Sequence, residues 1–253
     1  IYGGNIASTM AGEFSFSISL SLAILTFGLL IRAFEEHRGK MLTAVVLALS
    51  ALSHGIVLLF VFGGVVLLAA IWYTKKTTIT AVTISVTAIL LSSFWVLPFL
   101  TGHAYMTDMK YEPRPSGASD SFWKMYFPLA TFWDVLIFVF ACVGFAVFVK
   151  RRNRTGIWMG VYCVVLVFGV YFGRESLPVI GLLWNPRLLP FLYLLRYFLM
   201  FVGMYESVIW LMGFYQLQRL GRQALTRSPD QELIPLASVR ENARFNLSWI
   251  TAM

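Results

Sequence analysis

Charged residues are scarce in this chain of 253 residues: they make up 13% of it, whereas hydrophobic residues make up 58%. A water-soluble domain carries about 25% charged residues, and a globule of this size cannot bury so large an apolar share. The composition therefore excludes a secreted, cytosolic or nucleic-acid-binding domain as the main interpretation. It indicates an integral membrane protein.

Cysteine and histidine are also scarce, with two and three residues. Cys142 and Cys163 both lie in apolar runs, which argues against a disulfide framework. His37, His54 and His103 lie in three separate segments, at no spacing typical of metal ligands. The phosphate-loop, dinucleotide-binding and nucleophile-elbow motifs of soluble enzymes are absent. The residues therefore identify no cofactor, and a divalent metal ion is left open.

Apolar runs of about 20 residues, the length that crosses a bilayer as a helix, recur along the chain. Five of them qualify or nearly qualify: Phe14–Phe34, Thr78–Leu100, Leu129–Val149, Ile157–Gly173 and Leu188–Phe214. A sixth run, Met41–Tyr73, would be about 50 Å long as one helix, too long for one span and short for two. Because Ser53–Gly55 interrupts it, we predict a break and a reversal near His54. The predicted fold is all-α, a polytopic membrane helix bundle of about seven transmembrane helices that includes a broken hairpin.

The basic residues support this reversal. With seven crossings, most Lys and Arg residues fall on one side, which the positive-inside rule assigns to the cytoplasm. They are Arg32, Arg38, Lys40, Lys75, Lys76, Lys150, Arg151, Arg152, Arg154, Arg219, Arg222, Arg227, Arg240 and Arg244. These clusters also account for the net charge of +8, so no nucleic-acid partner is inferred. We predict a transmembrane bundle over residues 1–214 and a basic, partly helical cytoplasmic tail over residues 215–253.

The remaining polar residues are then expected on the opposite, outward face. Asn5 and Glu13 lie in a stretch of small residues that leads into the first apolar helix, where Glu13 suits a general base, a ligand for a metal or sugar hydroxyl, or a plain helix cap. His54, at the outer turn, suits an acid or a phosphate ligand, or a packing residue. Asp134 and Glu206 lie inside spans, where an ionisable group costs about 2.5–3.5 kcal/mol and usually marks a site.

The loop Thr101–Pro128 combines charged with aromatic residues, which suits recognition of a sugar or a phosphate. Its candidate substrate-binding residues are Asp108, Lys110, Tyr111 and Arg114. A solvated loop beside an interfacial aromatic belt (Trp123, Tyr126, Phe127) explains the same composition. Arg187 and Arg196, at the mouth of the last span and inside it, are candidate phosphate ligands. Their alternatives are headgroup anchoring for Arg187 and an ion pair with an intramembrane acid such as Asp134 for Arg196.

Two stretches carry a resemblance to a known family: G-G-N-I-A-S-T-M-A-G-E-F-S-F-S from Gly3 and L-L-W-N-P-R-L-L-P-F-L-Y from Leu182. Together they resemble prokaryotic multi-span proteins named 6-pyruvoyl-tetrahydropterin synthase-related membrane proteins, which are similar to GT-C glycosyltransferases. The resemblance covers most of residues 1–214. It implies a site on the outer face of the plasma membrane, with Glu13 and Arg187 in the matching stretches. It also implies a catalytic Asp upstream of Ile1, so we expect the chain to be part of a longer protein.

The activity that this resemblance implies is transfer of a sugar from a polyprenyl-phosphate donor to a cell-surface glycan or lipid acceptor. A carboxylate would activate the acceptor hydroxyl, while Arg187, Lys110 or His54 would stabilise the departing lipid phosphate. The expected partners are this donor, the acceptor and membrane lipids, with no nucleic acid. Two alternatives stay open: a lipid or solute transporter or flippase, which also places charges and broken helices inside spans, and a non-catalytic membrane scaffold subunit.

Overall fold

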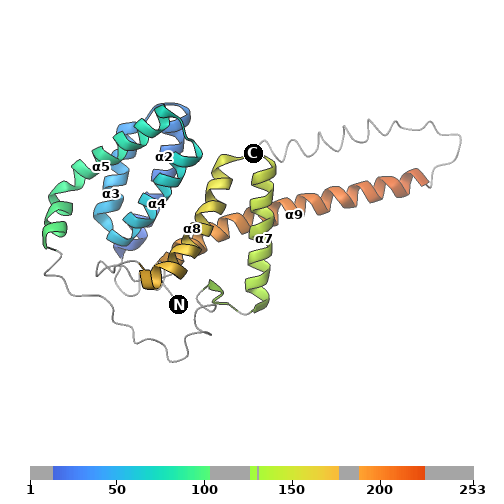
Figure 1. Ribbon diagram of the computed structural model, residues 1–253. Helices are drawn as coiled ribbons and strands as arrows, with labels where there is room; N and C mark the ends of the chain where they lie inside the picture. The colour runs from blue at the N-terminus through green and yellow to red at the C-terminus, as the bar shows by residue number, and fades with distance from the viewer. Residues whose placement is uncertain (1–13, 103–125, 130, 177–187, 226–253) are drawn as a thin grey trace, which may run out of the picture.

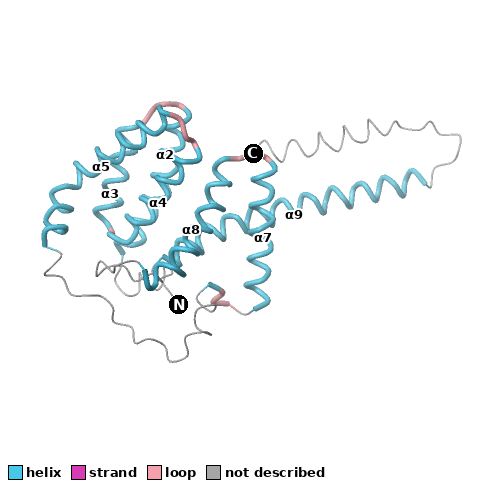
Figure 2. Tube along the Cα trace, in the orientation of Figure 1, coloured by secondary structure: helices cyan, strands magenta, loops and turns pink. Residues whose placement is uncertain are grey.

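The computed structural model describes residues 14–102, 126–129, 131–176 and 188–225, and its regular elements in those ranges are helices. In chain order they are α2 (Phe14–Glu35), α3 (Lys40–Ser53), α4 (Gly55–Ile71), α5 (Lys75–Gly102), α7 (Thr131–Lys150), α8 (Arg154–Ser176) and α9 (Leu189–Leu225). Helices α2 to α5 form one group, α7 and α8 lie beside them, and α9 projects beyond the bundle (Figures 1 and 2). The predicted all-α class is confirmed for the described residues.

Four of the described helices are long and apolar enough to cross a membrane: Phe14–Glu35, Lys75–Pro98, Thr131–Lys150 and Leu189–Gln216. Helices α3 and α4 and the segment Arg154–Val170 are apolar but shorter. Large apolar side chains also cover the outside of the bundle, among them Phe94 on α5 and Trp210 on α9, which are 72% and 69% exposed. Such a surface suits contact with lipid. The expected count of seven crossings stays a prediction.

The apolar run from Met41 to Tyr73 forms two antiparallel helices, α3 and α4, joined at His54 (Figure 1). His54 has an extended backbone (φ −160°, ψ 121°), and it both ends α3 and precedes α4. His37, which precedes α3, and Thr74, which follows α4, both line one cavity, so the start of α3 and the end of α4 lie at the same end of the bundle. The chain therefore returns to the end from which it started, and the predicted reversal is confirmed.

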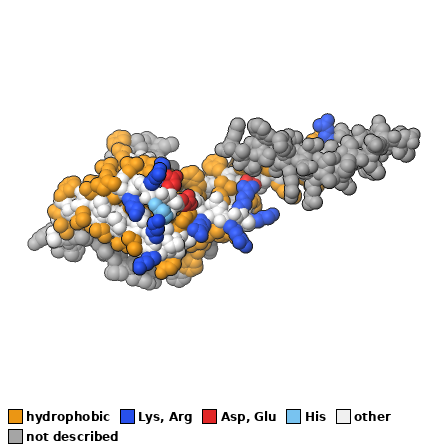
Figure 3. Space-filling model, turned by 90° about the horizontal axis from the view of Figure 1, so that it is seen from above, with side chains coloured by type: hydrophobic (Ala, Val, Ile, Leu, Met, Phe, Trp, Pro, Cys, Tyr) orange, Lys and Arg blue, Asp and Glu red, His pale blue; other side chains and the backbone are white. Residues whose placement is uncertain are grey.

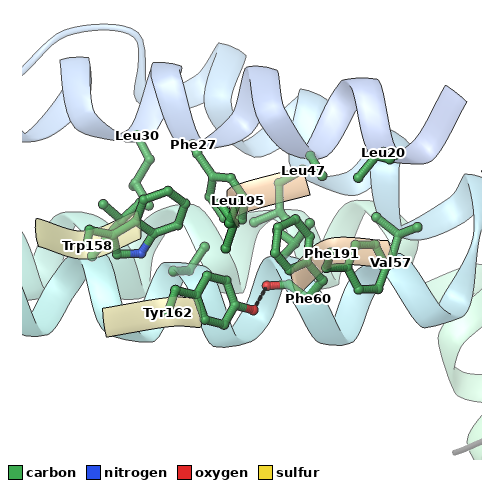
Figure 4. Packing of buried hydrophobic residues seen from close by; sticks show 14 of the residues in the cluster. Leu20, Phe27, Leu30, Leu47, Val57, Phe60, Trp158, Tyr162, Phe191 and Leu195 are labelled. Carbon is green, nitrogen blue, oxygen red and sulfur yellow. Dashed lines mark hydrogen bonds between the residues drawn. The ribbon is translucent and has the colours of Figure 1, made fainter. Parts of the chain in front are cut away.

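Aromatic side chains from α4, α8 and α9 pack together and join the α2–α5 group to the later helices. The ring of Phe60 on α4 stacks on Tyr162 of α8 and on Phe191 of α9, with centroid distances of 5.2 and 4.4 Å (Figure 4). The Tyr162 hydroxyl donates a hydrogen bond to the carbonyl oxygen of Phe60, and Trp158 Nε1 donates to that of Gly64 at 3.1 Å. These two bonds attach α8 to α4 inside the core, where a net hydrogen bond contributes about 1 kcal/mol.

Small residues allow the closest approaches between helices. Ser19 on α2 and Ser50 on α3 are buried, and each hydroxyl donates to the other residue's carbonyl oxygen, at 2.7 and 3.0 Å. Gly144 on α7 and Gly203 on α9 each face the backbone of the other helix. Reciprocal polar contacts and facing glycines are the means by which helices associate in lipid, where no hydrophobic effect drives them together.

Helix α9 has 37 residues, which corresponds to about 55 Å. It continues without a break across residue 214, so the first part of the expected tail is helical up to Leu225. The rest of that tail, residues 226–253, lies outside the described residues. The division of the chain at residue 214 stays a prediction.

Candidate functional site

Two of the residues predicted to form the site, His54 and Arg196, lie within the described part of the chain. The remaining ones lie outside it: Asn5, Glu13, Asp108, Lys110, Tyr111, Arg114 and Arg187. Their roles stay predictions. The structure can instead show which described elements meet at the end of the bundle that contains His54, hereafter the His54 end.

The beginnings of three helices meet at this His54 end. The Phe16 ring on α2 makes an edge contact with the His54 ring, at a centroid distance of 5.4 Å. The same Phe16 ring lies against Phe191 in the first turn of α9, at 5.9 Å. Phe16 belongs to the first stretch that carries the family resemblance and Phe191 to the second. The fold thus brings together two distinctive stretches that are far apart in the sequence.

Arg196 lies two turns into α9 and is 7% exposed. Its Nη1 donates a hydrogen bond of 2.7 Å to the carbonyl oxygen of Tyr126, in the segment that precedes α7. Three aromatic rings surround the guanidinium, whose central carbon is 5.2 Å from the Tyr193 centroid and 5.8 Å from those of Phe127 and Tyr197. Cation–π contacts of this kind stabilise a buried cation.

The other edge of the Arg196 guanidinium has no partner among the described residues. Nε and Nη2 are both buried, and neither makes a hydrogen bond there. These two nitrogens form the edge through which arginine makes two parallel hydrogen bonds to a phosphate or a carboxylate. Buried donors are normally satisfied, and an anionic group with two acceptor oxygens is one that could satisfy both nitrogens of this edge.

Asp134, in the first turn of α7, is 3% exposed. Its Oδ2 accepts a hydrogen bond of 2.9 Å from the Leu129 N–H, whereas its Oδ1 is buried with no hydrogen-bond partner among the described residues. In that part of the chain Asp134 does not form the ion pair with Arg196 that was one alternative for the latter, because the two ion pairs found there join other residues. Asp134 and Arg196 therefore both hydrogen-bond to the backbone of the short segment 126–129. Each also has buried polar atoms without a partner among the described residues: Oδ1 of Asp134, and Nε and Nη2 of Arg196.

Tyr126 and Asp134 are residues that the sequence-based list of site residues lacks. The sequence marks Asp134 as an intramembrane acid and offers an interfacial aromatic belt as one of two alternatives for Tyr126. The structure does not support a belt position, because Tyr126 is buried and its hydroxyl donates to the carbonyl oxygen of Val167 on α8, at 2.9 Å. A single Tyr in an aromatic cluster carries no signal that would distinguish these two locations.

Glu206, the second acid expected to mark a site, has a structural partner instead. Its carboxylate accepts a hydrogen bond of 2.7 Å from Arg151, in the basic loop between α7 and α8. Glu206 therefore lies near the basic loops and away from the His54 end. Within the described residues no three His, Cys, Asp or Glu side chains gather as metal ligands would.

An all-helical bundle with an apolar outer surface, four helices able to span a bilayer and buried polar groups between them defines a polytopic helical membrane protein. The sequence model of a membrane-protein family, described as the 6-pyruvoyl-tetrahydropterin synthase related domain, matches residues 1–211. The chain belongs to this family. Searches of curated proteins and of solved structures found no match.

Proposed function

We propose that this protein is a membrane-embedded glycosyltransferase that takes a sugar from a polyprenyl-phosphate donor. The observation that carries the proposal is the open, buried Nε–Nη2 edge of Arg196. A guanidinium inside a span costs about 2.5–3.5 kcal/mol, and its contacts with Tyr126 and three rings satisfy one edge only. The phosphate of a lipid-linked donor would satisfy the other edge while its polyprenyl chain stays in the bilayer.

The proposed reaction is a displacement at the anomeric carbon of the sugar, in which an acceptor hydroxyl attacks and the lipid phosphate leaves. A carboxylate takes the proton of the hydroxyl, the hydroxyl oxygen bonds to the anomeric carbon, and the bond from that carbon to the phosphate oxygen breaks. The electron pair leaves with the phosphate, whose charge Arg196 stabilises. Glu13 is the carboxylate that the sequence favours, and the open Oδ1 of Asp134 is a second acceptor at this end. The proposal places the active site at the His54 end, on the outer face of the membrane.

The test is sugar transfer in membranes that contain the protein. Polyprenyl-phosphate sugars labelled with tritium in the sugar are supplied, and label in glycan or lipid acceptors is counted for the wild type and for Arg196→Lys. Lysine keeps the charge but lacks the two-nitrogen edge. Loss of a charge-assisted hydrogen-bond pair of about 1.5–3 kcal/mol predicts transfer slower by roughly 10- to 100-fold. Arg38→Lys, the same change at an exposed position of the opposite end, should transfer at the wild-type rate.

A second candidate function, a lipid flippase or transporter, is favoured by the break in the apolar run at His54. Broken helices inside spans commonly form substrate sites in transporters. Movement of labelled lipid between leaflets without transfer from any donor would reject the enzyme in favour of this candidate. If neither activity is found in the wild type, both candidate functions are rejected.

A further inference from the structure

A cavity of about 610 Å³ lies at the end of the bundle opposite His54. It is lined by three connections that are distant in the sequence, with residues from the end of α2 and the α2–α3 turn, the α4–α5 turn and the α7–α8 turn. Its lining residues are Phe34, Glu35, His37, Trp72, Thr74, Lys76, Thr77, Arg152, Asn153, Arg154 and Thr155. Lys and Arg side chains gather on this face of the molecule (Figure 3). We call the cavity with these lining residues the cationic cavity.

The cationic cavity carries an excess of positive charge. Lys76, Arg152 and Arg154 line it, and Glu35 is the acid among its lining residues. The ion pairs within the described residues, Arg32–Glu36 and Arg151–Glu206, use none of these three cations. Three cations that converge on one cavity repel each other unless an anion lies between them.

Helix ends add to this positive potential. Helices α5 and α8 begin at the cavity, and neither has an acid in its first turn. The N-terminus of a helix carries about half a positive charge, which normally attracts Asp or Glu, but here the first turns carry Lys76 and Arg154. Side chains already cap these ends: Thr74 accepts from the Thr77 N–H at 3.1 Å, and Asn153 accepts from the Gly156 N–H at 2.9 Å. The cationic side chains are therefore the groups that would hold a bound anion.

The backbone around the cavity is strained at two positions. His37 (φ 59°) and Arg152 (φ 52°) are the non-glycine residues with a left-handed backbone within the described ranges, and both line this cavity. Left-handed residues commonly end helices, and at Arg152 two backbone hydrogen bonds close the end of α7, from the Arg152 N–H to Val149 at 3.0 Å and from the Asn153 N–H to Phe148 at 2.9 Å. The two left-handed residues bring the two turns to the same cavity.

Part of the wall is apolar. Phe34 and Trp72, which are both buried, line the cavity, and the Arg154 guanidinium lies over the Trp72 ring at 5.9 Å from its centroid. The cavity thus joins a cationic mouth to the apolar body of the bundle. Basic pockets between transmembrane helices that combine these features bind phospholipid headgroups.

We propose that the cationic cavity binds a phosphate group through Lys76, Arg152 and Arg154. The phosphate can come from an anionic phospholipid in the adjacent leaflet or from a soluble phosphate. This site lies at the opposite end from the proposed transferase centre and does not depend on it.

The test uses the whole chain, purified in a non-ionic detergent or held in lipid nanodiscs. Phosphatidylglycerol binding is measured by native mass spectrometry, with phosphatidylcholine as the neutral lipid and inorganic phosphate as the soluble competitor. The cavity variant is Lys76→Gln with Arg152→Gln and Arg154→Gln. The matched control, Arg38→Gln with Lys40→Gln and Lys75→Gln, removes the same charge from the same end but leaves the lining intact.

The cavity variant should bind phosphatidylglycerol at least about tenfold more weakly than the wild type, and the matched control should change much less. Phosphatidylglycerol binding that inorganic phosphate does not displace identifies the lipid as the source, whereas displacement by inorganic phosphate identifies the soluble anion. An equal loss in both variants, or no binding of either probe by the wild type, would overturn the proposal.

A further variant separates binding from folding. Arg152→Gly removes one cation and places glycine where the backbone is left-handed, a conformation that glycine adopts without strain. Its thermal stability should equal or exceed that of the wild type, while its phosphatidylglycerol binding falls several-fold. A purely structural Arg152 would instead leave lipid binding unchanged in this variant.

Discussion

The contact between α7 and α9 depends on glycine at two facing positions. A Cβ added to Gly144 would overlap the carbonyl oxygen of Leu199, and one added to Gly203 would overlap that of Phe140. Both obstacles are backbone atoms, which cannot rotate away as a flexible side chain can. An alanine at either position therefore forces the two helices apart.

The size of the effect follows from two opposing terms. Alanine is favoured over glycine inside a helix by about 0.5–1 kcal/mol, whereas overpacking of a close interface costs about 1–3 kcal/mol. Gly203→Ala should therefore lower the free energy of unfolding by about 0.5–2 kcal/mol. Gly213, on the same helix, has open space at the Cβ position, so Gly213→Ala should raise it by about 0.5–1 kcal/mol.

The two variants can be compared by unfolding in mixed micelles of dodecyl maltoside and SDS, followed by near-ultraviolet circular dichroism. The two variants should differ in free energy of unfolding by about 1–3 kcal/mol. Because both replace glycine by alanine in the same helix, this difference measures the cost of overpacking at Gly203. The double variant Gly144→Ala with Gly203→Ala should lose less than the sum of the single losses, because one separation of the helices relieves both overlaps. Equal stability of Gly203→Ala and Gly213→Ala would refute the close contact.

Two further predictions concern the aromatic core and the topology. Tyr162→Phe removes the hydrogen bond to the α4 carbonyl oxygen and should lower the free energy of unfolding by about 1 kcal/mol in the same assay, whereas Tyr73→Phe, at an exposed position, should leave it unchanged. In a cysteine-free background, Arg38→Cys and Lys75→Cys should react with an impermeant maleimide from the same side of the membrane and Glu112→Cys from the other. Opposite reactivity of positions 38 and 75 would show that the chain crosses only once between them.

The reversal at His54 could be predicted because two independent signals agree. The apolar run is too long for one span, and the basic residues on both sides of it, such as Lys40 and Lys75, need to share one face. The structure ends α3 at Ser53 and starts α4 at Gly55, as this argument requires. Length and charge are properties that a sequence displays directly.

The surroundings of Arg196 could not be predicted in the same way. Its hydrogen-bond acceptor, the carbonyl oxygen of Tyr126, is 70 positions away and is a backbone atom, so no residue type announces it. The sequence offers Asp134 as the plausible ionic partner, but that carboxylate bonds to the backbone N–H of Leu129. Partner choice inside a bundle depends on how helices rotate about their axes, which the apolar pattern of an almost uniformly hydrophobic helix leaves undetermined.

The cationic cavity shows a related limit. In the sequence, the basic residues Lys76, Arg152 and Arg154 are interpreted as signals of membrane orientation. That interpretation explains on which side of the membrane they lie, but it does not predict that they line one cavity. Their convergence depends on the left-handed turns at His37 and Arg152, and neither residue type is one that a sequence marks as a turn of this kind in the way glycine does. A charge that orients a helix can therefore also form part of a site.

The two proposed phosphate sites differ in the physics that would hold the ligand. The cations of the cationic cavity are exposed, so their attraction for an anion is screened by salt over about 8–10 Å. The Arg196 guanidinium is buried among rings, where mobile ions screen it far less. Ionic strength therefore acts on the first site much more than on the second. The two sites share no residue, so a failure of lipid binding at the cationic end leaves the argument for Arg196 intact, and a failure of sugar transfer leaves the argument for the cavity intact.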